Sequence, residues 1–230
     1  MNVHDLFARL SHGHLSNLVW GADGTGTIQE EFQDRTVSFI NEALTKIHSR
    51  FLQRLDLVQI EMQEGIQRYR LSPVYAVSHT TPNQTAPSYI LDTTEEPFLG
   101  GVIRILSIQD TEVGENITPV SARALAHNTV FVKEPRPGGI LQVEYQADHP
   151  RLSIPVDPEE EISLAPVLEG ALEAWVAHKV FSTLGGENHL VKARELLTAY
   201  EEACQMVKVE GLLNESLLTE TPRRRDRGFI

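Results

Sequence analysis

The sequence predicts an α+β fold: a helical bundle built from both ends of the chain, a mainly antiparallel β insertion between them, and an extended C-terminal tail. Apolar residues recur at three- and four-residue steps in 27–51 and again in 162–207, which is the period of amphipathic helices. Between these regions, short alternating segments bounded by Gly- and Pro-rich turns are typical of strands. The last residues are rich in arginine, and no core can be built from them.

These changes of pattern give the expected domain boundaries. The bundle comprises 1–52 and 158–218, the β-rich insertion 53–157, and the extended basic tail 219–230. Each helical region has more apolar surface than one helix can shield, so the two should pack against each other. The strands are joined by hairpins, and we therefore expect the inserted sheet to be mainly antiparallel.

The N-terminal region predicts two helices separated by a loop. Apolar residues spaced over 3–10 mark a short amphipathic helix, and a long helix follows over 27–51. Thr27 and Glu30 have the spacing of a capping box. The loop 21–27 is rich in glycine, but it lacks both the Gly-Lys-Ser/Thr ending and the preceding strand of a phosphate-binding loop.

Two β-hairpins are expected in the insertion. The first spans 57–71 around a turn at 63–65, and a clearer one spans 129–145 around the turn Pro135–Gly139. Further strands are expected at 89–91 and 102–108.

The C-terminal region 162–207 predicts two helices that fold back on each other, because only the short break Leu184-Gly185-Gly186 separates them. Ser163 is the expected N-cap of the first helix, with Pro166 in its first turn. Cys204 lies on the apolar stripe of the second helix, so we expect a buried core residue rather than a reactive thiol.

The composition argues against several classes of protein. A net charge of −12 is unfavourable for a chain that grips nucleic acid through its phosphates. The apolar runs are far below membrane-spanning length and the first residues lack a basic signal-peptide start, so we expect a soluble protein made in a reducing compartment. A single cysteine leaves no internal disulfide framework and no cysteine-rich zinc site.

The sequence contains no evident catalytic or metal-binding pattern. Among the nine histidines, His12 and His14 lie two apart, but no third ligand has matching spacing. A Gly-x-Ser-x-Gly nucleophile motif is absent. The run Glu159–Glu161 is interpreted as favourable negative charge before a helix N-terminus. We therefore expect no enzymatic activity, no cofactor and no metal.

The C-terminal tail is the segment whose composition points to a partner. The candidate binding residues are its arginines and its last two apolar residues: Arg223, Arg224, Arg225, Arg227, Phe229 and Ile230. A cationic strand of this kind could dock into an acidic groove on a partner, with the apolar end as an anchor. A disordered solubilising end and a nucleic-acid-binding arm are the alternatives.

Four stretches carry a similarity through their order and spacing. They are the helix end at Phe51 with the turn 65–71, the strand 103–108 with Gln109-Asp110, Val143–Pro150, and Ile162–Phe181 with the Gly185-Gly186 break. Together they resemble the tail-adaptor, or head-to-tail connector, proteins of short-tailed phages, over roughly Thr27 to Val207.

The resemblance implies a non-enzymatic virion structural protein, made in the host cytoplasm and located at the head–tail junction of the capsid vertex. Copies would form a dodecameric ring that joins the portal protein to the tail nozzle or tube. DNA would pass through the channel without specific binding, no membrane would be involved, and the segment 221–230 would reach the portal. Two alternatives stay open: another tail-tube or head-completion subunit, and a virion-associated hydrolase.

Overall fold

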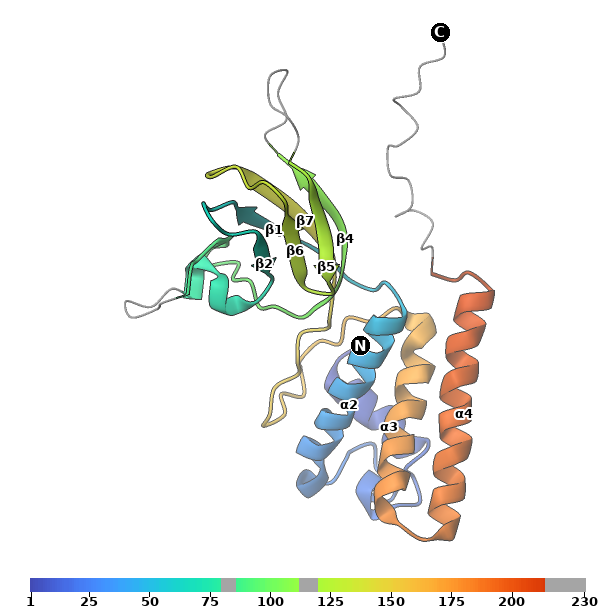
Figure 1. The fold of residues 1–230 in the computed structure, drawn as a ribbon. Coiled ribbons are helices and arrows are strands. Elements are labelled where there is room, and N and C mark those ends of the chain that lie inside the picture. Colours follow the sequence, from blue (N-terminus) through green and yellow to red (C-terminus); the bar gives the residue numbers. More distant parts are fainter. Residues whose placement is uncertain (80–85, 112–119, 214–230) are drawn as a thin grey trace. The chain divides into compact units, whose positions relative to one another are not determined.

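The computed structural model describes residues 1–79, 86–111 and 120–213 of the chain (Figure 1). It confirms an α+β fold with antiparallel sheets. The chain divides into two compact units: a helical unit of Met1–Leu52 together with the chain from Arg151 onward, and a β unit of Gln53–Pro150. The two ends of the chain therefore share one unit, and the β unit is an insertion between them.

The helical unit contains four α-helices and two short 3-10 helices in its described part. They are α1 (Val3–His12), η1 (Val19–Gly24), α2 (Glu30–Arg50), η4 (Pro166–Leu168), α3 (Glu169–Leu184) and α4 (Glu187–Val209). Figure 1 shows α2, α3 and α4 alongside one another, with α3 and α4 forming the expected antiparallel hairpin. The break between α3 and α4 requires glycine, because Gly185 has φ +70° and Gly186 has φ +80°.

The core of the helical unit joins residues that lie far apart in the sequence. Leu6, Ile40, Leu44, Leu172 and Val176, from α1, α2 and α3, are each 0–1% exposed. Removing such side chains from water is the main favourable term in folding, at about 25 cal/mol per Å² of apolar surface. One continuous apolar core thus joins the N-terminal helices to α3 and α4.

Two helix starts differ from the sequence expectation. The helix α2 begins at Glu30 after Gln29, which makes no side-chain cap, so Thr27 and Glu30 do not form a capping box. Ser163 is not an N-cap either, because the chain first turns helical at Pro166. Backbone groups in both segments bond outside the helix: the Gln29 N–H donates to the Trp20 carbonyl at 3.1 Å, and the Ile162 N–H donates to the Met1 carbonyl at 2.8 Å.

The β unit contains a four-stranded and a three-stranded sheet in its described part. Its elements are β1 (Leu55–Glu61), β2 (Arg68–Arg70), η2 (Pro73–Tyr75), η3 (Val77–His79), β3 (Ile90–Leu91), β4 (Val102–Asp110), β5 (Ala122–Ala126), β6 (Thr129–Val132) and β7 (Ile140–Ala147). The first sheet has the order β3-β1-β7-β4 and the second the order β2-β6-β5. The strand pairs in both sheets are antiparallel.

Neither predicted hairpin forms, although most of the predicted strands do. The strand β7 pairs with β1 and β4, whereas β6 pairs with β2 and β5. The turn before β7 closes on β1 instead of β6, since the Gly138 N–H donates to the Met62 carbonyl at 2.8 Å and the Met62 N–H donates to the Gly139 carbonyl at 2.7 Å. The chain thus passes from one sheet to the other at both predicted turns.

One buried core explains why the strands are shared out in this way. Ile60 and Val143 from the first sheet and Tyr69, Val130 and Val132 from the second are all 0–5% exposed and belong to the same apolar cluster. The two strands of each predicted hairpin lie in different sheets, and each strand contributes side chains to this cluster. Packing between sheets is a long-range effect, and a local turn signal does not report it.

Candidate interaction surfaces

The predicted partner-binding residues of the tail, Arg223, Arg224, Arg225, Arg227, Phe229 and Ile230, lie outside the described residues. The described part of the chain offers three other features with chemistry of their own: a hollow on the helical unit, a sheet face rich in arginine, and a Ser–His–Asp cluster in the β unit. None of the three was predicted from the sequence.

The hollow lies where α2, α3 and α4 meet and has a volume of about 460 Å³. Lys46 Nζ stands 4.5 Å from the centroid of the Trp175 ring, which is close enough for a cation–π interaction. The Trp175 ring meets the Tyr200 ring edge-on, with centroids 5.0 Å apart. In the described chain, the buried Trp175 Nε1 has no hydrogen-bond partner.

An ion pair closes one side of this hollow. Arg50 Nη1 donates to Glu201 Oε2 at 2.6 Å, and this hydrogen bond raises the pKa of the arginine. Burial raises the pKa of Tyr200 to about 12 and also raises the pKa of the Cys204 thiol. The thiol is fully buried, as the sequence predicted, and at neutral pH it stays protonated and inert. The hollow therefore offers a cation and an aromatic face, which suit an anionic side chain of a partner.

Sequence reasoning missed the hollow for a definable reason. Trp175 was counted with the apolar stripe of its helix, and it is indeed 92% buried since its exposed fraction is 8%. The available signal was the spacing of Lys46 and Arg50, which lie four residues apart on α2 and so project from the same helix face. That signal shows a cationic helix face but not the aromatic wall opposite it.

The second feature is the outward face of the three-stranded sheet, here named the arginine face: Arg68, Arg70, Arg123 and Phe131. Arg68 and Arg70 flank the fully buried Tyr69, so their side chains point away from the core. In the strand register, Arg68 and Arg123 both stand opposite Phe131 on β6. The Arg123 guanidinium carbon lies 5.3 Å from the Phe131 ring centroid.

The arginine face carries uncompensated positive charge. All three arginines are exposed, and in the ranges 1–79, 86–111 and 120–213 none of them forms an ion pair. The three strands β2, β5 and β6 contain no Asp or Glu. The alternation of Arg68 and Arg70 about Tyr69 was a readable signal, but the return of Arg123 to the same face depends on a pairing that only the structure shows.

The Ser–His–Asp cluster consists of Ser78, His79 and Asp92. Ser78 Oγ hydrogen-bonds both Asp92 Oδ2 and His79 Nδ1, the latter at 2.9 Å. The Asp92 carboxylate also accepts from the Ser78 and Phe98 N–H groups at 2.8 Å each, and its pKa is lowered because these hydrogen bonds outweigh its partial burial.

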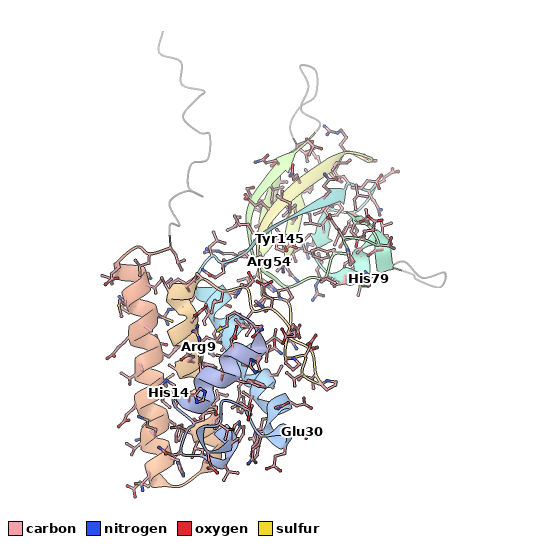
Figure 2. The ribbon with its side chains drawn as sticks, turned by 180° about the vertical axis from the view of Figure 1, so that it is seen from behind. Arg9, His14, Glu30, Arg54, His79 and Tyr145 are labelled. Carbon is pink, nitrogen blue, oxygen red and sulfur yellow. The ribbon has the colours of Figure 1, made fainter. Side chains whose placement is uncertain are left out.

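This arrangement differs from a catalytic triad. In a triad the carboxylate orients the histidine, which in turn contacts the nucleophile. Here the carboxylate contacts the serine, and His79 is an exposed end of the network (labelled in Figure 2). The bonds of Asp92 instead tie η3 to the segment before Phe98 and order that part of the β unit.

The other histidines do not converge. Among the described residues, no group of three His, Cys, Asp or Glu side chains could hold a metal ion. His12 Nδ1 contacts the Gly24 carbonyl at 3.0 Å, whereas His14 lies exposed beyond the end of α1 (Figure 2). The described helices include none that is both long and apolar enough to cross a membrane.

No protein-family model matches this sequence, and a search of the curated proteins finds no match.

Proposed function

We propose that this chain is a virion structural protein: a ring-forming adaptor that joins the portal to the tail and continues the DNA channel of a short-tailed phage. The observation that carries the proposal is the ordered set of four sequence stretches that resemble tail adaptors, together with the organisation of the fold. A helical unit made from both chain ends, with a β unit inserted, is the arrangement that the sequence pattern predicts, and the resemblance implies a helical bundle and a β block that face different partners.

The four stretches fall on structural elements of both units. The first runs from the end of α2 to β2, the second is β4, the third is β7 with the residues after it, and the fourth covers η4 and α3 up to the break before α4. The resemblance therefore extends over the framework of each unit rather than over one local motif.

The surfaces of the chain suit an assembly protein. The helix α4 and the turn after it carry large apolar side chains that are 45–73% exposed: Leu190, Val191, Met206, Val209 and Leu212. On the same helix Leu196 faces the core, with an exposed fraction of 3%, so the exposed apolar side chains lie away from the buried stripe. Exposed apolar side chains concentrated on one element favour contact with another protein.

Charge supports the channel function. The net charge of −12 repels the phosphates of passing DNA, so a ring of acidic subunits would surround DNA without holding it. In the proposal the subunit needs no cofactor, metal or catalytic group.

The direct test is electron microscopy of the purified chain mixed with the portal protein of the same virus. The proposal predicts rings of this chain seated on the portal. A chain that stays monomeric in the presence of portal and does not bind it would contradict the proposal. A location elsewhere in the particle would favour the tail-tube or head-completion alternative, and cell-wall or nuclease activity of the pure chain would favour the hydrolase.

A further inference from the structure

The acidic run before the C-terminal helices lies against the start of α1 rather than at the start of α3. This acidic loop, 157–161, contains Asp157, Glu159, Glu160 and Glu161. The sequence predicted that the run directly precedes a helix N-terminus, but η4 begins at Pro166 and α3 at Glu169. The charges therefore lie too far from α3 to be stabilised by its dipole, and they lie instead beside the first turn of α1 (Val3–His12), where negative charge is favourable.

The acidic loop is held in place by the first residues of the chain. The Val3 N–H donates to the Glu160 carbonyl at 3.1 Å, and the His4 N–H donates to the Pro158 carbonyl at 3.0 Å. The backbones of Asn2 and Glu161 also form an isolated antiparallel β-bridge. Asp157, Glu159 and Glu161 nevertheless have exposed side chains. A fixed backbone that presents exposed carboxylates loses little entropy when it binds a partner.

The carboxylates of the loop lack cationic partners. Within the described part of the chain, none of its four acidic residues forms an ion pair with Lys, Arg or His. Their hydrogen bonds go to neutral groups: Glu160 accepts from the Ser153 N–H and hydroxyl at 2.8 and 2.7 Å, and Glu159 accepts from Asn2 Nδ2 at 3.4 Å. The loop is thus the counterpart of the arginine face, where positive charge is equally unpaired.

We propose that the acidic loop of one copy of this chain docks on the arginine face of a second copy. Planar guanidinium groups bind carboxylates through paired hydrogen bonds, and the exposed part of the Phe131 ring gives the contact an apolar floor. In a ring, each copy places its loop on one neighbour and its face against the loop of the other neighbour. This contact is heterologous, and heterologous contacts generate a ring when the rotation between copies closes. The inference rests on the proposed ring-forming function and names one of its subunit contacts.

A protein partner is favoured over nucleic acid at this face. Nucleic acid is a polyanion, so it is repelled by the net charge of −12 on the protein over distances comparable to the Debye length. A second copy offers a short acidic segment, and the three arginines match in number its three exposed carboxylates, Asp157, Glu159 and Glu161. The test must therefore distinguish binding of an oligonucleotide at the arginine face from binding of a second copy.

The test uses two full-length charge-reversed variants. The face-reversed variant is R68E/R70E/R123E, and the loop-reversed variant is D157K/E159K/E161K. Each changes only exposed side chains, and each leaves one half of the contact intact. Assembly on the portal is measured by sedimentation velocity and electron microscopy, for each variant alone, for their equimolar mixture, and for one chain that carries all six changes.

Each variant alone should assemble about tenfold or more weakly than the wild-type chain, since its loop and face then repel each other. The mixture should restore assembly, because the acidic loop of one variant meets the intact arginine face of the other and the lysine loop meets the glutamate face. The chain with all six changes should also assemble by itself. Control variants with the same change of charge at other exposed sites, R104E/R151E/R194E and E64K/E95K/E96K, should assemble more strongly than the matched test variants.

Three results would overturn the inference. The first is assembly of the single variants at the level of their charge-matched controls. The second is failure of the mixture to recover while the chain with all six changes does recover, which would place the contact within one chain. The third is tight binding of a labelled oligonucleotide that the face-reversed variant alone loses. If the wild-type chain itself forms no ring on the portal, the proposed function fails. If the wild-type chain forms rings and the variants give one of the three results above, only the proposed subunit contact fails.

Discussion

Asn41 on α2 and Leu152, just after the β unit, exchange two hydrogen bonds across 111 positions of sequence. Asn41 Nδ2 donates to the Leu152 carbonyl at 3.2 Å, and the Leu152 N–H donates to Asn41 Oδ1 at 2.9 Å. The Leu152 side chain is 4% exposed and belongs to the helical core. The chain therefore rejoins the helical unit at Arg151, ahead of the expected boundary at 158.

Replacing Asn41 with alanine should destabilise the helical unit. Both backbone groups of Leu152 lose their partner, and leaving buried polar groups unpaired costs about 1–3 kcal/mol. Urea denaturation followed by tryptophan fluorescence measures this selectively, because Trp20 and Trp175 both lie in the helical unit. N188A, at an exposed position on α4, should change the stability by less than about 0.5 kcal/mol. Equal effects of the two substitutions would contradict the role given to Asn41.

The Thr36 hydroxyl makes two hydrogen bonds that a valine side chain cannot make. It donates to the Phe32 carbonyl at 2.8 Å and accepts from Trp20 Nε1 at 2.8 Å. T36V keeps the shape but leaves the buried indole N–H unpaired, so we expect a loss of about 1–3 kcal/mol in the same fluorescence assay. Thr198 is a matched control, because it makes the same bond to the residue four positions earlier, at 3.1 Å, but is exposed. T198V should leave the stability within about 0.5 kcal/mol of wild type.

Gly185 occupies a conformation that other residues avoid. Its φ of +70° and ψ of −179° lie in a region that is essentially restricted to glycine. G185A should cost roughly 1–3 kcal/mol, measured as a lower urea midpoint. G170A is the opposite case: Gly170 lies in the first turn of α3, and an added Cβ meets nothing within 4 Å. That substitution should stabilise the protein by about 0.4–1 kcal/mol, and a destabilising G170A would refute the reasoning.

Much of this architecture could be predicted from the sequence, because its strongest signals are local. The helical periodicity of α2 and α3, the Gly185-Gly186 break and the burial of Cys204 all depend on residues within a few turns of one another. The strand β4 was predicted for the same reason, because its signal is a continuous segment of the sequence.

What the sequence did not predict depends on contacts between distant residues. The turn at Pro135–Gly139 indicated a hairpin, but β7 gains two partners, β1 and β4, only by leaving β6. The arginine face arises from the same rearrangement, since Arg68 and Arg123 meet across Phe131 only when β6 lies between β2 and β5. No periodicity within one strand contains that information.

High pH should destabilise the helical unit through Tyr200. Burial raises its pKa from the ordinary 10.0 to about 12, so between these values the unfolded chain loses a proton that the native chain keeps. The native state then binds more protons, and its stability falls as the pH rises, by at most about 1.4 kcal/mol per pH unit for one tyrosine. Below the ordinary pKa this contribution is constant.

The design uses a tyrosine of the other unit as its control. Burial likewise raises the pKa of Tyr145 in the β unit to about 12. In urea denaturation followed by tryptophan fluorescence, Y200F should reduce the alkaline loss of stability, and Y145F should not. If Y200F leaves the slope of stability against pH unchanged, the loss has another source.

Removal of the C-terminal segment 221–230 should separate folding from attachment. The apolar core of the helical unit is built from residues up to Val207, with Leu213 packed against it, so the truncated chain should keep the wild-type urea midpoint within about 0.5 kcal/mol. If the arginines and the last two apolar residues of the segment contact the portal, the truncated chain should bind portal more weakly. A full-length chain with all four tail arginines changed to glutamine keeps the length and removes the charge, and its portal affinity shows whether charge carries the contact. Portal binding as tight in the truncated chain as in the wild type would mean that the tail does not dock, and attachment would then depend on the helical and β units alone.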